Sequence, residues 1–216
     1  MSIEKNILRI IESLPKEVTL IAVSKTKSNE QILEAYNAGQ RDFGENRVQE
    51  IIPKYEMLPK DIRWHLIGHL QTNKVKQIAP FIHLIHSVDS ENLLAEINKQ
   101  AAKCNRIIPI LLQIFIAQEE TKFGFSFEEA EKLISENPGT KYPNVRIDGL
   151  MGMATNTENQ DQIRNEFHSL NQFKIQSRSL GTKFKILSIG MSSDWKIAIE
   201  EGSTMIRVGS SIFGNQ

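Results

Sequence analysis

The sequence of 216 residues has little of three things: cysteine, excess charge of one sign, and long apolar segments. The single cysteine, Cys104, excludes an internal disulfide framework and fits a reducing compartment. Lysine and arginine number 26, as do aspartate and glutamate, so the net charge of +0 points to no nucleic-acid or membrane partner. No apolar run has the length of a membrane helix, and charged residues interrupt the N-terminal helical pattern, unlike a targeting peptide. We therefore expect a cytoplasmic protein.

A GxGxxG motif is also missing after the first predicted strand, which weakens the case for an open, doubly wound sheet. Instead, eight apolar segments typical of strands alternate with helical patterns. These segments cover residues 18–25, 41–45, 62–68, 84–89, 107–116, 146–153, 184–191 and 204–209. Eight βαβ-type repeats predict a closed (β/α)8 TIM barrel, preceded by an extra helix over residues 3–14. We expect residues 1–216 to form one barrel domain, with the doubly wound sheet as the alternative.

Polar or small residues stand at the ends of these strands. In a barrel of this type the carboxyl ends of the strands form the functional face. The residues at these ends are Lys25, Glu45, Asn46, His65, Gly68, Ser87, Asp89, Gln113, Met151, Met153, Ser192 and Arg207. Each has an ordinary explanation by itself, but together they predict a lined pocket.

Lys25 ends the first apolar strand, VTLIAVSK. Strand alternation places it on the same side as Ile21 and Val23, although this parity does not distinguish the barrel lumen from the helix layer. One interpretation is a surface lysine just beyond its strand. The other is an amine in a partly desolvated site that condenses with an aldehyde to form a Schiff base.

The last two strand ends predict an anion site. The segment SIGMSSD, residues 188–194, leads into a helix, and VGSS, residues 208–211, offers glycine and two hydroxyl groups. The loops after strands seven and eight are the usual phosphate site of this fold, although ordinary capping and turns would use the same residues. A phosphate site beside a reactive lysine would suit a phosphorylated aldehyde, such as pyridoxal 5′-phosphate.

Arg207 lies on the last strand, on one face with Met205 and Gly209. A buried arginine stays charged and only donates hydrogen bonds. Opposite a pyridine nitrogen it would disfavour ring protonation and make the cofactor a poor electron sink. The alternative is an ion pair with a carboxylate on a neighbouring strand.

Several longer blocks of sequence resemble the pyridoxal phosphate homeostasis protein family. They are AVSKTKS at 22–28, FGENRVQE at 43–50, WHLIGHLQTNKVK at 64–76, IHSVDS at 85–90, EETKFGF at 119–125, GLMGMAT at 149–155, LSIGMSSD at 187–194 and IRVGSSIFG at 206–214. The order is the same, and the resemblance covers nearly the whole chain. Two departures are Ser28, where family members usually carry proline, and the apolar stretch 115–118 before EETKFGF.

The resemblance implies a barrel similar to the N-terminal domain of alanine racemase, with pyridoxal phosphate as its cofactor. It implies that Lys25 forms the Schiff base and that Arg207 faces the pyridine nitrogen. Ser192, Gly209 and Ser210 would hold the phosphate. Asn46 in the GEN motif and Met151 in the GLMGM motif are implied as further contacts.

The predicted function is that of a non-catalytic cofactor protein that binds pyridoxal phosphate reversibly and buffers or delivers it in vitamin B6 homeostasis. Racemisation needs a second acid or base and, in related enzymes, a second domain, and the sequence identifies neither. Candidate partners are pyridoxal-phosphate-dependent apoenzymes, and we expect a monomer. The alternatives are a low-activity amino-acid racemase and a sugar-phosphate enzyme with Lys25 as an aldolase-type amine. Histidines 65, 69 and 86 show no metal-ligand pattern.

Overall fold

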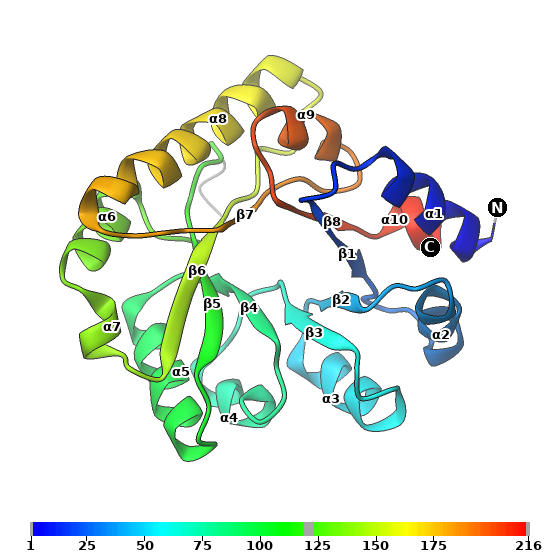
Figure 1. The fold of residues 1–216 in the computed structure, drawn as a ribbon, viewed down its shortest axis with the longest axis horizontal. Helices are drawn as coiled ribbons and strands as arrows, with labels where there is room; N and C mark the ends of the chain where they lie inside the picture. The colour runs from blue at the N-terminus through cyan, green and yellow to red at the C-terminus, as the bar shows by residue number, and fades with distance from the viewer. Residues whose placement is uncertain (1, 119–122, 215–216) are drawn as a thin grey trace.

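The computed structural model describes residues 2–118 and 123–214, and its centre is a closed barrel of eight parallel strands in sequential order (Figure 1). β8 pairs with β1 to close the barrel, with Ile21 opposite Arg207. The strands are β1 Thr19–Val23, β2 Asp42–Glu45, β3 Arg63–Leu66, β4 Leu84–Val88, β5 Ile108–Gln113, β6 Val145–Met151, β7 Ile186–Ser188 and β8 Met205–Val208. The predicted (β/α)8 barrel is confirmed, and each strand lies within the segment expected for it, apart from one residue of β6.

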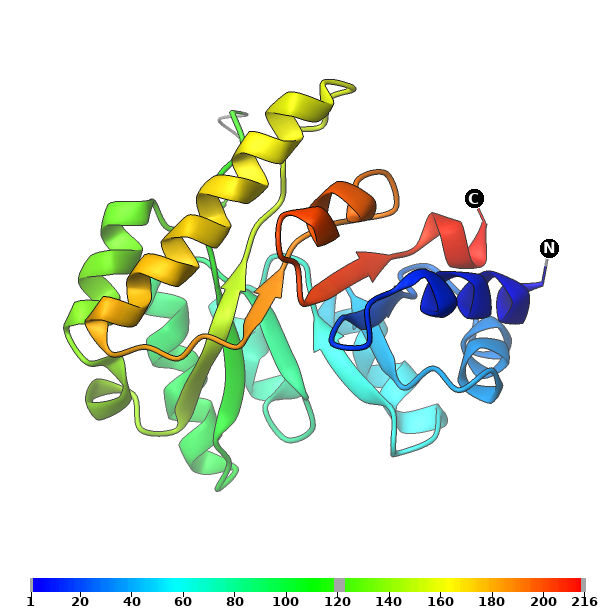
Figure 2. The same ribbon diagram turned by 45° about the horizontal axis from the view of Figure 1, so that its top comes forward.

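Helices surround the barrel and connect its strands (Figures 1 and 2). They are α1 Ile3–Ser13, α2 Asn29–Asn37, α3 Val48–Met57, α4 Val75–Ile78, α5 Glu91–Lys103, α6 Phe127–Ser135, α7 Pro138–Lys141, α8 Gln160–Gln176, α9 Trp195–Glu200 and α10 Ser210–Phe213, with 3-10 turns η1 Thr72–Lys74 and η2 Ser177–Leu180. The short helices α7 and α10 and the turn η2 were not expected from the sequence. Of the helices described, none has both the length and the apolar character that a membrane crossing requires.

The extra N-terminal helix α1 lies beside the C-terminal helix α10, so the two ends of the described chain are neighbours (Figure 2). The Asn6 side-chain amide donates to the Ile212 carbonyl at 2.9 Å. The buried side chains of α1, Ile7 and Ile10, belong to the main core. This helix therefore covers the region where the first and last strands meet.

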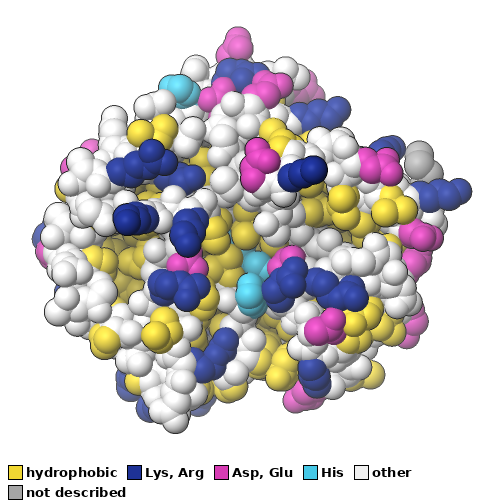
Figure 3. All heavy atoms as spheres, viewed as in Figure 1, with side chains coloured by type: hydrophobic (Ala, Val, Ile, Leu, Met, Phe, Trp, Pro, Cys, Tyr) yellow, Lys and Arg dark blue, Asp and Glu magenta, His cyan; other side chains and the backbone are white. Residues whose placement is uncertain are grey.

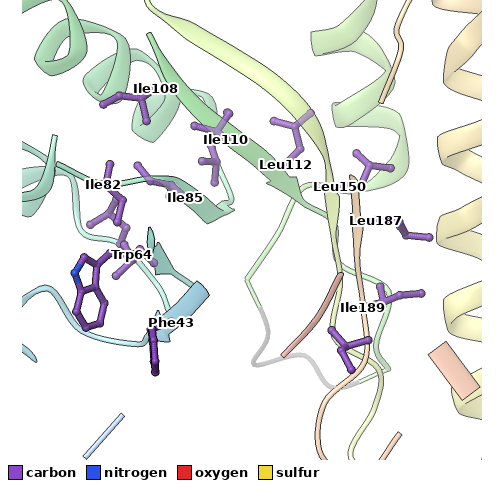
Figure 4. Packing of buried hydrophobic residues seen from close by; sticks show 14 of the residues in the cluster. Phe43, Trp64, Ile82, Ile85, Ile108, Ile110, Leu112, Leu150, Leu187 and Ile189 are labelled. Carbon is purple, nitrogen blue, oxygen red and sulfur yellow. The ribbon is translucent and has the colours of Figure 1, made fainter. Parts of the chain in front are cut away.

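Most residues of the strands are buried, on both faces of the barrel wall. One face packs against the helices, and Figure 4 shows Phe43, Trp64, Leu112, Leu150 and Leu187 in this outer layer. The other face lines the lumen, where a smaller apolar group lies beside buried polar side chains. That group consists of Ile21, Leu84, Leu111, Met151 and Met205. Burial on both faces explains why strands such as β1, TLIAV, and β5, IPILLQ, are apolar along their length rather than alternating.

Candidate functional site

A cleft of about 780 Å³ opens at the carboxyl ends of the strands. Its size lies within the range of small-molecule sites in proteins. Six of the seven residues predicted for the cofactor site line it. They are Lys25, Asn46, Ser192, Arg207, Gly209 and Ser210. The structure therefore brings the predicted lysine, arginine and hydroxyl groups together in one cavity.

A second cavity, of about 510 Å³, lies elsewhere on the molecule. Val145 and Phe184 line it, and they stand where β6 begins and just before β7. This is the end of the barrel where strands start, which in this fold contributes to stability rather than to chemistry. We therefore place the candidate site in the larger cleft.

Lys25 stands two residues beyond β1, on a tight turn. Its side chain is exposed, so the partly desolvated amine expected from the sequence is not what the structure places at this position. The turn holds the backbone: the Lys27 amide donates to the Ser24 carbonyl at 3.0 Å, and the Thr26 amide to Glu50 at 2.8 Å. Thr26 has φ of 63°, which for a β-branched residue costs about 1–3 kcal/mol. The fold thus fixes the base of the lysine and leaves its amine accessible.

A buried ion pair supports this turn from behind. Lys54 of α3 donates to Glu45 of β2 at 2.7 Å and to the Ser24 carbonyl at 2.8 Å, and the Ser24 hydroxyl donates to the same carboxylate at 2.6 Å. Burial raises the pKa of Glu45, and the nearby Lys54 opposes this shift. Because residue 24 directly precedes Lys25, the pair ties the turn that carries Lys25 to β2 and α3.

Arg207 is buried at the bottom of the cleft, 4% exposed. One guanidinium nitrogen donates to the Ser188 carbonyl at 2.7 Å and to the Ser188 hydroxyl at 2.6 Å, and the other to the Gly152 carbonyl at 3.1 Å. Within the described part of the chain these partners are neutral oxygen atoms, so the alternative of an ion pair with a neighbouring strand is not seen. Burial lowers the pKa of Arg207 to about 10, which still leaves it charged at neutral pH.

The loops after β7 and β8 are joined at the predicted phosphate site. The Gly209 amide donates to the Ser192 hydroxyl at 3.2 Å. A Cβ at Gly209 would lie 3.3 Å from the Val23 backbone oxygen, tighter than most real contacts. The carboxylate of Asp194 accepts the Met191 amide at 2.5 Å and closes the other loop. Hydroxyl groups and a close backbone therefore meet at one end of the cleft.

Asn46 and Met151, the two remaining predicted contacts, differ in position. Asn46 lines the cleft beside Gly68, where a Cβ would collide with the Asn46 backbone. Met151 is fully buried in the lumen group and does not line the cleft, whereas Met153, two residues further on, does. Gln113 gives the cleft a contact from β5. Of the EETKFGF motif, residues 119–122 lie outside the described residues.

His69 is a cleft residue for which the sequence suggested no role. Its Nδ1 lies 2.9 Å from a carboxylate oxygen of Asp89, and its ring stacks on Phe123 with centroids 4.4 Å apart. The signal in the sequence was its place directly after Gly68, at the end of the third strand. Such a histidine–aspartate pair is a common form of general acid or base.

Three potential metal ligands, Asp42, His65 and His83, lie within 4.8 Å of one another near the start of the strands. Both oxygens of Asp42 already accept hydrogen bonds, two from Arg63 at 2.5 and 2.7 Å and one involving His65 at 3.0 Å. The arginine beside this carboxylate also disfavours a second cation. We assign no metal to this cluster.

Comparison with known proteins defines the class of this barrel. A family model of the alanine racemase N-terminal domain matches residues 1–216. An alanine racemase from Clostridium difficile superimposes with a TM-score of 0.81 at 14% identity, over 100% of this chain and 57% of that one, which shows the shared fold. The chain is therefore a barrel of the alanine racemase N-terminal-domain class.

Relatives with higher sequence identity place the protein in one family within this class. A pyridoxal phosphate homeostasis protein from Aquifex aeolicus is 41% identical over 91% of this chain and 86% of its own length. One from Escherichia coli is 37% identical over 93% of this chain and 86% of its own length. The PipY structures from Synechococcus elongatus without and with PLP give TM-scores of 0.93 and 0.89, at 36% identity and over 99% of this chain and 100% of theirs. The chain belongs to the pyridoxal phosphate homeostasis protein family.

Proposed function

We propose that this protein binds pyridoxal 5′-phosphate through a Schiff base with Lys25 and acts in vitamin B6 homeostasis as a carrier or buffer. The observation that carries the proposal is one cleft lined by an accessible lysine, a buried arginine and the joined β7 and β8 loops. The relatives named for pyridoxal phosphate homeostasis, and the PipY structure with PLP bound, support the same ligand.

The donor set of the cleft fits this cofactor part by part. The amine of Lys25 matches the aldehyde, with which it forms an imine and releases water. Ser192, Gly209 and Ser210 match the phosphate with hydroxyl and backbone N–H donors. The charged guanidinium of Arg207 matches the pyridine nitrogen, and because arginine only donates, it keeps that nitrogen unprotonated.

A carrier needs a bond that forms and breaks, without a group that drives chemistry at the bound amino acid. An exposed lysine on a fixed turn meets the first requirement, since water and competing amines reach it. An unprotonated ring meets the second, because it withdraws few electrons from a substrate carbon. Transfer to apoenzymes, action as a monomer and a cytoplasmic location belong to this proposal.

The second candidate function is a low-activity amino-acid racemase, and the His69–Asp89 pair favours it. This pair contributes an acid or base from the β3 side of the cleft, while Lys25 stands at the end of β1. Deuterium exchange at the α-carbon of alanine separates the candidates. Sustained exchange that disappears in His69→Ala would replace the carrier proposal with the racemase.

Absorption spectroscopy with borohydride trapping tests the attachment. Wild-type protein mixed with pyridoxal phosphate is expected to give a Schiff-base band near the visible range, and peptide mapping after reduction to find the label on Lys25. Lys25→Ala should lose the band. The matched control is Lys27→Ala, which removes a lysine two residues away and should keep it. A labelled peptide that does not contain residue 25 would refute the assignment.

A further inference from the structure

A continuous chain of hydrogen bonds runs through the barrel lumen to Arg207. The Asp42 carboxylate lies 3.0 Å from His65 Nε2, and His65 Nδ1 lies 2.9 Å from His86 Nε2. His86 Nδ1 is 3.0 Å from the Ser188 hydroxyl, which is 2.6 Å from Arg207. The members come from β2, β3, β4, β7 and β8, so the chain crosses the interior from the start of β2 to the floor of the cleft.

The two ends fix the direction of every hydrogen bond between them. Arginine only donates, so the Ser188 hydroxyl accepts from Arg207 and gives its own proton to His86 Nδ1. Ionised aspartate only accepts, so His65 Nε2 carries a proton and donates it to Asp42. His65 Nδ1 must then accept from His86 Nε2–H. Both imidazoles are therefore neutral, each with its proton on Nε2.

Burial and charge agree with these tautomers. Burial lowers the pKa of both His65 and His86, although Asp42 opposes the shift at His65. Burial raises the pKa of Asp42, but hydrogen bonds from Arg63 and His65 outweigh it and hold that pKa well below its usual range. The charged groups around the chain are Asp42 and Arg63 at one end and Arg207 with Asp194 at the other.

The outer end of the chain is open to solvent. Arg63 is 46% exposed, and His83 beside it is exposed. Figure 3 shows histidine side chains between acidic and basic ones near the middle of the face in view. The inner end is closed, since His86 and Ser188 are fully buried. The hydrogen-bond chain therefore links a solvated ion pair to a buried arginine, whose acceptors among the described residues are the neutral oxygens of Ser188 and Gly152.

We propose that Asp42, His65, His86 and Ser188 form a positioning chain that orients the Arg207 guanidinium and sets the electrostatic environment of the ligand above it. The part concerning the ligand rests on the proposed pyridoxal phosphate function. Every X–H bond in the chain points from Arg207 toward Asp42, so the lone pairs face the guanidinium and stabilise its charge. The lumen neighbours Ile21, Leu84 and Leu111 are apolar, so a polar chain is not what filling the lumen requires.

Nuclear magnetic resonance of the ligand-free protein tests the chain directly. With ¹⁵N-labelled histidine and arginine, we expect His65 and His86 to show Nε2–H tautomers that do not titrate between pH 5.5 and 8, and Arg207 to show slowly exchanging guanidinium protons. Asp42→Asn changes the far end without touching Arg207 and is expected to accelerate that exchange at least roughly threefold, as expected for a weakened charge-assisted bond. Ser188→Ala is expected to accelerate it further. Nδ1–H tautomers of the two histidines would refute the proposed hydrogen-bond chain. Unchanged exchange of the Arg207 guanidinium protons in both variants would also refute it.

The bound cofactor gives the second readout. In Asp42→Asn and Ser188→Ala, the pH midpoint of the Schiff-base absorbance is expected to shift by roughly half a unit or more, since both variants loosen the hydrogen bonds that hold the charged Arg207 guanidinium beside the ligand. The control is Met205→Leu, a volume-conserving change in the same lumen, which should leave the midpoint unchanged. Equal midpoints in all folded variants would contradict the link to the ligand. If the wild type never gives the Schiff-base absorbance, the proposed function is refuted. The exchange of the Arg207 guanidinium protons in ligand-free protein would still test the hydrogen-bond chain independently.

Discussion

Two buried polar systems support the two ends of the cleft, and they are built differently. Behind Lys25, the Lys54–Glu45 pair lies between the barrel and α3 and holds a backbone turn. Behind Arg207, a chain of neutral imidazoles and a hydroxyl lies in the lumen and holds a side-chain head group. The lysine therefore has a fixed base and a free amine, whereas the arginine has a fixed guanidinium. This difference suits the proposed function, in which the Schiff base to Lys25 forms and breaks while Arg207 stays fixed beside the pyridine ring.

The largest expected effect is a loss of folding stability when the Lys54–Glu45 ion pair is broken. Lys54→Met leaves the Glu45 carboxylate buried without its cation, and losing one partner of such a pair costs about 3–5 kcal/mol. Urea unfolding monitored by circular dichroism measures the loss. The double variant Lys54→Met with Glu45→Gln removes both charges and should recover most of it. A single variant as stable as wild type would mean that the pair does not support the turn.

An intermediate effect is expected at the outer end of the lumen chain. The pKa of Asp42 is lower in the folded protein than its usual value of 3.8, so its stabilisation is present above about pH 4 and is lost as the pH falls below that value. Asp42→Asn should therefore cost about 2 kcal/mol at pH 7 and roughly half as much near pH 2.5, where Asp42 is still ionised in the fold but already protonated in the unfolded chain. Unfolding by urea at both pH values measures this convergence. If the unfolding free energies of wild type and Asp42→Asn differ by the same amount at both pH values, Asp42 is not ionised in the fold.

The sequence was sufficient for the barrel and for much of the cleft, because the order of strands and the polar strand ends follow from local patterns. It could not assign Lys25 to the lumen side, since strands buried on both faces show no alternation. The same uncertainty at strand ends explains Met151, which lies below the cleft while Met153 reaches it.

The two polar systems were beyond sequence reasoning for a different reason. Lys54 meets Glu45 only when α3 folds back on β2, and nothing local marks that lysine as buried. The His65–His86–Ser188 contacts depend on the stagger between strands that are distant in sequence, since His86 and Ser188 are 102 positions apart. Contacts between these side chains are set by the register of the strands, so they can be recognised only in the closed barrel.

The smallest expected effect concerns the strained turn, and it sharpens the contrast between a fixed base and a free amine. Asparagine tolerates the left-handed region better than threonine, so Thr26→Asn should stabilise the fold by about 0.5–1 kcal/mol while keeping the backbone amide that donates to Glu50. Thermal unfolding measures the gain, and the rate of pyridoxal phosphate release measures the turn's influence on the lysine. Because the turn holds only the backbone of Lys25, the release rate should stay within about twofold of wild type, less than the tenfold that 1.4 kcal/mol would give. A much larger change would show that strain at Thr26 is transmitted to the amine, and that the lysine end of the cleft is held as tightly as the arginine end.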